Sequence, residues 1–378
     1  MTAKTDQGTW INMVGTYGVA SAQLYWGRMA ALVLRILYHM FPSIYWAFVY
    51  VDDYMFLIRT AKRFGNPWRA AAAILLVLQA TGFPLSWKKT VMSYINTWLG
   101  FQFDSLEGTI YLAPPKQIII TEICNRFTKG EQHSLDEAMT AIGRLQWCTG
   151  AYPHLKPFLQ PFYAWMNKLK TVGVPGKRCK LLAYAILNII NKPPASSREA
   201  PATSKWMGAS DAGADTDRAV VGGWISLGHP HNRHEVWWFC ERLNPVEHRW
   251  AFRKKDAKRQ IAAIELYGTL LLAGAMIDRE QAKVPVYLPM ETDNQGNAYA
   301  VLGKSTRRWP NAAILMELMV QALCAQITPE IRHVKRDLNT WADQLTHEDF
   351  TGFDPAKRVD VSQMKNKWKI IPKVLPPA

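Results

Sequence analysis

The sequence predicts a protein of α/β and α+β class, in which an α+β part and a helical part precede a mixed β-sheet with helices packed on it. Two observations predict this class. The first half of the chain passes from a helical pattern to strand-like runs and back to helical periodicity, whereas the second half begins with strand-like runs that then alternate with helical stretches. Hydrophobic residues make up 49% of the 378, enough to fill about two or three compact units.

Residues 1–114 are predicted to form the α+β part. The spacing of apolar residues in "GVASAQLYWGRMAALVLRILYHM" predicts a buried helix that ends before Pro42. "YWAFVYVDDYMFLI" then predicts a β-hairpin with Asp52 and Asp53 at its turn, because these two acids alone interrupt the aromatic and β-branched residues. A helix over 67–81 and two strands, "INTWLGFQFD" and "GTIYLA", complete this part.

Residues 115–192 are predicted to be helical. The three helical segments are "KQIIITEICNRFTKG", "SLDEAMTAIGRLQWCTG" and "KPFLQPFYAWMNKLK", and the second begins with Ser134 and Glu137 at the spacing of a capping box. Residues 193–204 are rich in Pro, Ser and Ala and lack periodicity, which predicts a linker.

Residues 205–348 are predicted to form the mixed sheet. Three strand-like runs, "KWMGASDAG", "RAVVGGWISLG" and "HEVWWFCERL", precede a helix at "QIAAIELYGTLLLAGAM". A buried strand "VPVYLPMETDN", a helix "AAILMELMVQALCAQ", a strand "EIRHVKR" and a last helical turn "NTWADQLT" follow. Residues 349–378 are a C-terminal tail whose order the sequence leaves open.

The net charge of +15 favours a polyanionic partner, and nucleic acid is the partner we expect. The five cysteines are scattered without C-x-x-C pairs, which argues against a zinc site or a disulfide framework and favours an intracellular protein, with nucleus, cytoplasm and organelle all open. No signal peptide and no membrane span is predicted, because residues 70–80 are too short and residues 24–51 are interrupted by basic residues.

Four acids in the second half lie where water is scarce. Asp211 ends a strand-like run, Glu265 lies within an apolar helix, Asp293 ends a strand, and Asp343 lies in the last helical turn. Each alone has an ordinary structural interpretation as a turn cap or a solvent-facing side chain. Together, four carboxylates suit two divalent cations that bind a phosphodiester.

The order of these acids resembles that of the ribonuclease H family, over roughly residues 205–348. "HVKRDLNTWADQLT" is similar to the closing motif of retroelement RNase H domains, with His333 ten residues before the last Asp, and with Asn339, Ala342 and Leu345 at matching places. The resemblance implies that Asp211, Glu265, Asp293 and Asp343 bind two Mg²⁺ (or Mn²⁺) ions. It also implies that His333, on a mobile loop, assists proton transfer or product release. A structural histidine is the competing interpretation.

In retroelements an RNase H domain follows a reverse transcriptase, and "YVDD" resembles the acidic turn of the polymerase palm. By that resemblance Asp52 is the principal metal ligand, beside Asp53. "YGVASAQLYW", "GFPLSWKKT" and "WLGFQFDSLEGTIYLAPPK" resemble flanking polymerase motifs, and Lys89, with Lys88 as the alternative, would lie near the incoming triphosphate. The helical segment "GRLQWCTGAYPHLKPFLQPFYAW" resembles the thumb or connection of the DIRS-like and long-terminal-repeat groups.

The chain departs from that family at its start. Only sixteen residues precede Tyr17, too few for the fingers and the first palm strand with its metal-binding Asp. Asp6 is the one acid there, and it lies in a polar segment, "AKTDQGT", that is not strand-like. Gln23 replaces the proline usual in related elements. We therefore expect a truncated reverse transcriptase whose palm is inactive in this chain alone.

Basic residues mixed with aromatics form two candidate nucleic-acid contacts, "KRFGNPWR" and "RWAFRKKDAKRQ", for which a solvated helix face is the alternative. The preferred second segment supplies Arg249, Arg253, Lys254, Lys255, Lys258 and Arg259. The leading function is hydrolysis of RNA in RNA–DNA hybrids. The alternatives are a non-catalytic scaffold subunit of a ribonucleoprotein or organellar complex, and a polyprotein fragment whose fingers are supplied upstream or by another chain.

Overall fold

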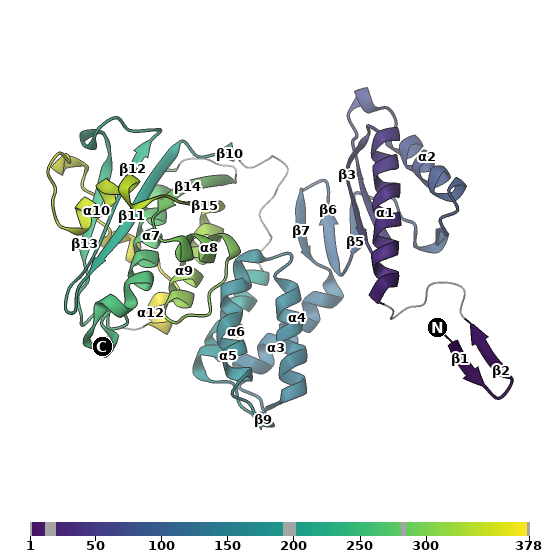
Figure 1. The fold of residues 1–378 in the computed structure, drawn as a ribbon, viewed down its shortest axis with the longest axis horizontal. Helices are drawn as coiled ribbons and strands as arrows, with labels where there is room; N and C mark the ends of the chain where they lie inside the picture. The colour runs from purple at the N-terminus through teal and green to yellow at the C-terminus, as the bar shows by residue number, and fades with distance from the viewer. Residues whose placement is uncertain (1, 12–19, 192–201, 281–284, 376–378) are drawn as a thin grey trace. The chain divides into compact units, whose positions relative to one another are not determined.

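The computed structural model describes residues 2–11, 20–191, 202–280 and 285–375, which form two compact units, Met1–Trp98 and Leu99–Ala378 (Figure 1). The boundaries predicted at residues 114, 192, 204 and 348 stay predictions. Within the predicted linker, however, Ala202–Thr203 form a short strand, β10, that pairs in parallel with a strand of the mixed sheet, while residues 193–201 lie outside the described residues.

The first residues of the N-terminal unit form a hairpin. Strands β1 (Thr2–Thr5) and β2 (Gly8–Ile11) pair antiparallel, and Asp6 lies in the turn between them. The prediction that this segment is not strand-like is therefore wrong. Threonines at positions 2, 5 and 9 suit strands, and Gly8, with φ of 131°, adopts a backbone conformation that other residues avoid.

The rest of the N-terminal unit packs two helices against a hairpin. Helix α1 (Ala20–Met40) precedes β3 (Ile44–Tyr50) and β4 (Asp53–Ile58), and α2 (Pro67–Ala80) begins at the cap residue Asn66. Short 3₁₀ turns, η1 (Lys62–Phe64) and η2 (Trp87–Lys89), and strand β5 (Ile95–Trp98) complete it. The buried core is small and consists of Val33, Leu37, Ile44, Ile74 and Leu78.

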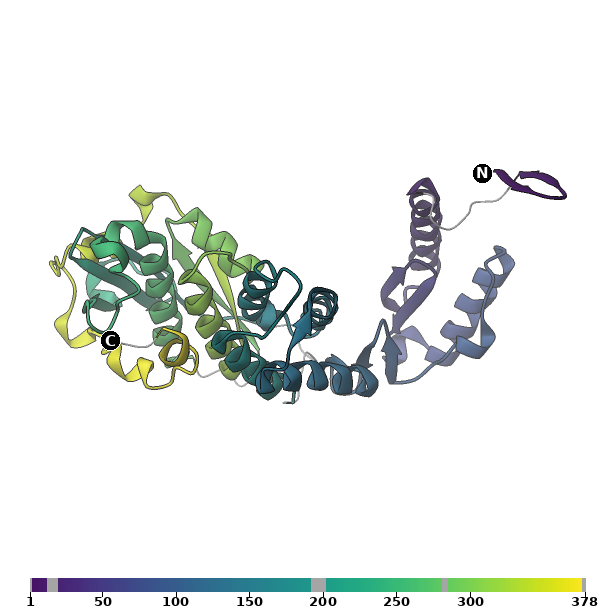
Figure 2. The same ribbon diagram turned by 90° about the horizontal axis from the view of Figure 1, so that it is seen from below.

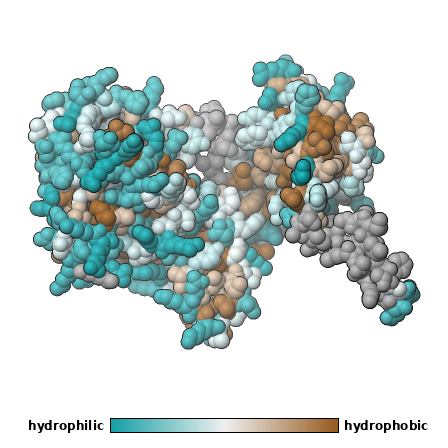
Figure 3. All heavy atoms as spheres, in the orientation of Figure 1, coloured by the Kyte–Doolittle hydropathy of each residue, from teal (hydrophilic) through white to brown (hydrophobic). Residues whose placement is uncertain are grey.

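The surface of the N-terminal unit is rich in apolar side chains, which Figure 3 shows in brown. Side chains more than half exposed include Tyr25, Met29, Trp46, Tyr50 and Trp68. A shallow pocket of about 190 Å³ is lined by Tyr38, Trp46, Ala47 and Phe48. Exposed apolar area of this kind is typical of surfaces that meet a partner.

The C-terminal unit begins with a hairpin and a helical bundle. "INTWLGFQFD" is not one strand, because Leu99 and Gly100 have φ of 50° and 80° and separate β5 from β6 (Phe101–Asp104). Strand β7 (Thr109–Leu112) pairs with β6 and leads into α3 (Pro114–Lys129).

The bundle continues with α4 (Leu135–Cys148), whose predicted capping box between Ser134 and Glu137 is confirmed. The third predicted helix is interrupted: residues Pro153–Leu159 form a 3₁₀ segment, η3, before α5 (Gln160–Met166), because Pro157 and Pro161 cannot donate helical hydrogen bonds. Helix α6 (Lys177–Ile190) follows, and strands β8 (His133–Ser134) and β9 (Val172–Gly173) pair beside the bundle.

The predicted fold class is confirmed by a mixed sheet. Strands β11 (Trp206–Ala214), β12 (Ala219–Leu227) and β13 (Trp237–Arg242) are antiparallel neighbours, and β14 (Val286–Thr292) and β15 (Ile327–His333) extend the sheet in parallel. The order is therefore β13-β12-β11-β14-β15, with β10 beside the first half of β14. The second half of the chain therefore contains the mixed sheet that the sequence predicts.

Helices cover both faces of this sheet (Figures 1 and 2). Helix α7 (Ile261–Ile277) lies against β11 and β12 and contacts α9 (Asn311–Ala325), whereas α10 (Thr340–Thr346) lies against the other face. Helix α8 (Gln295–Gly303), which the sequence analysis missed, follows β14 directly. Within the described residues, one helical stretch, Ala257–Ile277, is long and apolar enough to cross a membrane, but 67% of its apolar window is buried within the unit, as in a core helix.

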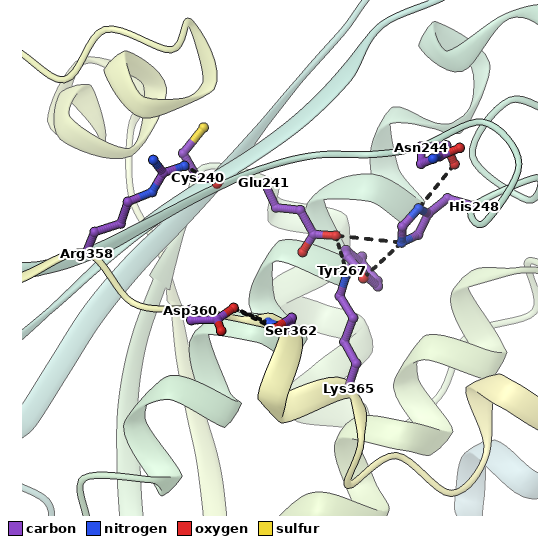
Figure 4. Close-up of polar contacts among 9 residues, drawn as sticks. All are labelled: Cys240, Glu241, Asn244, His248, Tyr267, Arg358, Asp360, Ser362 and Lys365. Carbon is purple, nitrogen blue, oxygen red and sulfur yellow. Dashed lines mark hydrogen bonds and ion pairs between the residues drawn. The ribbon is translucent and has the colours of Figure 1, made fainter.

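Over its described residues, 349–375, the C-terminal tail is ordered and packs on the sheet domain. It contains η8 (Pro355–Lys357), α11 (Ser362–Lys365) and α12 (Ile371–Val374). Trp238 of β13 anchors its start, since the indole donates to the carbonyl of Asp354 at 2.8 Å and stacks on Phe350. Further along, Lys365 forms an ion pair with Glu241, whose side chain is 12% exposed, beside His248 and Tyr267 (Figure 4).

Candidate active site

Adjacent parallel strands bring Asp211 and Asp293 together. In the register of β11 and β14, Ala209 lies opposite Glu291, so two residues further along each strand Asp211 lies beside Asp293. Asp211 does not end its strand as predicted. Its partner is Gly222 of β12, and that pairing continues to Ala214, so Asp211 lies inside β11.

The close approach of α7 to β11 places Glu265 beside Asp211 and Asp293. A Cβ on Gly268 of α7 would lie 3.4 Å from the carbonyl oxygen of Asp211, so the helix axis lies near β11 there. Glu265, three residues earlier and on the same helix face, therefore points to the two aspartates. Ligand oxygens of Asp211, Glu265 and Asp293 all lie within 4.8 Å of one another. We call these three residues the acid cluster.

The acid cluster is partly buried, with Asp211 buried and Glu265 and Asp293 half-buried, and it is short of compensating charge. Burial, with the nearby charge of Asp293 as a smaller cause, raises the pKa of Asp211 to about 7, even though its Oδ1 accepts a hydrogen bond from the amide of Ala212 at 2.7 Å. Burial raises the pKa of Glu265 to about 8, against the opposing effect of a hydrogen bond from Asn294. Oδ1 of Asp293 is buried and has no hydrogen-bond partner among the described residues.

These observations fit a divalent cation. Carboxylate oxygens are the ligands that Mg²⁺ prefers, and a bound cation would remove the like-charge repulsion and satisfy the unpartnered Oδ1 of Asp293. Among the described residues, the acid cluster is the one group of three His, Cys, Asp or Glu side chains with this spacing.

Asp343 lies apart from the acid cluster, at the start of α10. Its Oδ1 is 3.4 Å from the Arg336 guanidinium and its Oδ2 is 3.7 Å from Nε2 of His347, while its charge still contributes to the raised pKa of Asp211. Asn339, almost fully buried, fixes this helix to the site because its amide donates to the carbonyl of Ser210 at 3.3 Å. Arg336, with a side chain 80% exposed, was not among the predicted site residues.

His333 is the last residue of β15 rather than part of a loop. Its Nε2 lies 3.1 Å from the carbonyl oxygen of Asp293, and the residue is exposed. The histidine therefore lies next to the acid cluster and is open to solvent.

The predicted polymerase residues do not form a comparable group. The hairpin turn consists of Val51, with φ of 56°, and Asp52, whereas Asp53 begins β4 and pairs with Tyr50, so the prediction of both acids at the turn is corrected. Asp52, Asp53 and Lys89 are exposed, and none of the described acids near the turn joins them in a metal-like group.

The predicted nucleic-acid contact at residues 249–260 forms two 3₁₀ turns, η5 (Arg253–Lys255) and η6 (Ala257–Gln260), instead of the face of a helix. Asp256, which caps η6, interrupts the helix. Arg249, Arg253 and Lys255 are exposed, whereas Lys258 lies 3.2 Å from Asp215 and Arg259 lies 3.0 Å from Asp256. The Lys254 side chain lies outside the described part of the chain.

Neither a protein-family model nor a curated protein matches this chain. Solved structures do. A foamy viral protease–reverse transcriptase in complex with an RNA/DNA hybrid is 12% identical over 89% of this chain and 41% of that chain, with a TM-score of 0.44. A foamy viral protease–reverse transcriptase in complex with double-stranded DNA is 13% identical over 86% of this chain and 61% of that chain, with a TM-score of 0.41.

An N-terminal RNase H domain from Mycobacterium tuberculosis, fused to maltose-binding protein, is 18% identical over 39% of this chain and 94% of that chain, with a TM-score of 0.29. The chain thus spans 41% to 61% of the foamy viral chains that it matches. The roles of individual residues are therefore argued from the geometry of this chain.

Proposed function

We propose that the C-terminal unit hydrolyses the RNA strand of RNA–DNA hybrids. The observation that carries this proposal is the acid cluster: three carboxylates within 4.8 Å of one another, one buried and two half-buried, on β11, directly after β14 and on a core helix. Asp211, Glu265 and Asp293, with Asp343 from the facing helix, would bind two Mg²⁺ or Mn²⁺ ions. When bound, such ions activate a water molecule and stabilise the leaving 3′ oxygen.

The protein's own residues have distinct parts in this reaction. The paired strands and α7 hold the three carboxylates at fixed separations, so little reorganisation is needed when substrate arrives. His333 is exposed, and its Nε2 contacts the Asp293 carbonyl, which leaves Nδ1 to exchange a proton near the leaving group. Arg336 and the exposed Arg249, Arg253 and Lys255 offer cations to the phosphates of a nucleic acid.

The test is cleavage of a labelled RNA–DNA hybrid by the purified chain with Mg²⁺. Asp293→Asn and chelation of the metal are each expected to reduce the rate by at least about a thousandfold, because each removes charge stabilisation at the reacting phosphate. Asp217→Asn, an exposed acid between β11 and β12, is the matched control and should leave the rate unchanged. Hybrid binding without cleavage by the folded chain would refute the enzymatic proposal.

A non-catalytic scaffold is the second candidate. The exposed apolar side chains of the N-terminal unit, among them Trp46 and Tyr50, favour it. Polymerisation by this chain alone is not proposed, because Asp52 and Asp53 are exposed and lack a third described acid beside them. Primer extension with a templated primer tests this directly, and extension by the chain alone would contradict it.

A further inference from the structure

Two side-chain amides bind one oxygen of Glu265. Nδ2 of Asn294 donates to Oε2, and Nδ2 of Asn297 lies 3.4 Å from the same oxygen. The two oxygens of this carboxylate therefore have different surroundings: Oε2 accepts from two amides, whereas Oε1 accepts no hydrogen bond from the described residues.

The two amides are themselves fixed. Asn294 caps α8, since its Oδ1 accepts from the amide nitrogen of Asn297 at 2.9 Å. Asn297 is almost fully buried and also donates to the carbonyl of Ala262 at 2.9 Å, a carbonyl that Asn311 of α9 contacts at 3.2 Å. Three asparagines from the starts of two helices thus meet the first turn of α7, which carries Glu265.

We propose that Asn294 and Asn297 are positioning residues that reserve Oε1 of Glu265 for the metal and thereby favour Mg²⁺ over Ca²⁺. With Oε2 occupied, Glu265 offers a single oxygen. A single, rigidly placed oxygen suits the octahedral Mg²⁺ shell, whereas Ca²⁺ accepts carboxylates through both oxygens and tolerates variable geometry. This inference rests on the proposed function, because it assigns a role to residues that contact one of its metal ligands.

Calorimetric titration of the metal-free chain with Mg²⁺ and, separately, with Ca²⁺ tests this without any activity measurement. Asn294→Ser keeps a capping side chain but removes the amide donor. The ratio of the Mg²⁺ to the Ca²⁺ association constant is expected to fall about tenfold, which corresponds to about 1.4 kcal/mol. Asn297→Ala, which keeps the cap at Asn294, should lower the same ratio.

Asn311→Ala is the matched control, because it removes an amide from the Ala262 carbonyl without touching Glu265. In this variant the ratio of the Mg²⁺ to the Ca²⁺ association constant should equal that of the unchanged chain. An unchanged ratio in Asn294→Ser and Asn297→Ala, or an equal fall in Asn311→Ala, would overturn the positioning role alone. Failure of the unchanged chain to bind either cation would instead overturn the two-metal function, and this inference with it.

Discussion

Replacing Glu317 by glutamine is expected to lower the free energy of unfolding of the C-terminal unit by about 3–5 kcal/mol. The carboxylate is fully buried in α9, and its Oε2 accepts from the amide nitrogens of Lys369, Ile370 and Ile371 at 3.0, 2.6 and 3.0 Å. Its Oε1 accepts from Lys369 at 3.1 Å and from Gln321 at 2.8 Å. A glutamine amide would turn an NH₂ group toward donors in either orientation.

The magnitude follows from the number of donors left without an acceptor. With the glutamine oxygen in the Oε2 place, two donors, the backbone N–H of Lys369 and the side-chain amide of Gln321, would face the NH₂ group, and each hydrogen bond to a charged group contributes roughly 1.5–3 kcal/mol. Urea unfolding gives the free energy, and amide hydrogen exchange at residues 369–371 locates the change. Glu330→Gln, exposed on β15, is the control. A loss below about 1 kcal/mol with unchanged exchange would refute the reasoning.

Three further perturbations have defined outcomes. Gly222→Ala should destabilise the unit by about 1–3 kcal/mol in thermal unfolding, because the new Cβ would lie 2.6 Å from Cβ of Leu345; a native melting temperature would contradict this. Burial lowers the pKa of His248 to about 4, so the folded chain favours the neutral ring. The contribution of the neutral ring to the free energy of unfolding is therefore fully present above pH 6.5, and the free energy falls by about 3 kcal/mol toward pH 4. Urea unfolding midpoints measured across this pH range should show the fall. His248→Gln should reduce this pH dependence. Ser134→Ala removes half of the capping box with Glu137 and should cost about 1 kcal/mol in urea unfolding, with no effect on hybrid cleavage.

The sequence was sufficient to predict the elements that carry the acids. The approach of Asp211 to Asp293 was implied by the resemblance to the ribonuclease H family, and its physical cause is the parallel pairing of β11 and β14, which the pattern of each strand does not predict. The position of Asp211 within its strand did not follow, because strand length depends on the pairing of Gly213 and Ala214 with β12. Asp343 was predicted to bind metal together with these acids, but its distance from the acid cluster depends on how α10 packs on the sheet.

The amide contacts could not be predicted from the sequence. Asn294 directly follows Asp293, which indicates that it lies near the site. The hydrogen-bond partner of its side-chain amide, however, is decided by tertiary packing. Glu317 is similar. An acid within "AAILMELMVQALCAQ" reads as solvent-facing until the tail, more than fifty residues later, supplies the N–H groups that surround it.

The tail also bears on the behaviour of the protein at high concentration. Strand β13 ends the order of the sheet, and an uncovered end strand offers backbone groups to which a strand of another molecule can pair. In this protein the amide of Val359 donates to the carbonyl of Trp238 at 2.7 Å, and the Arg358 guanidinium lies over the Trp238 ring. A version cut after residue 348 would expose that strand and is expected to aggregate.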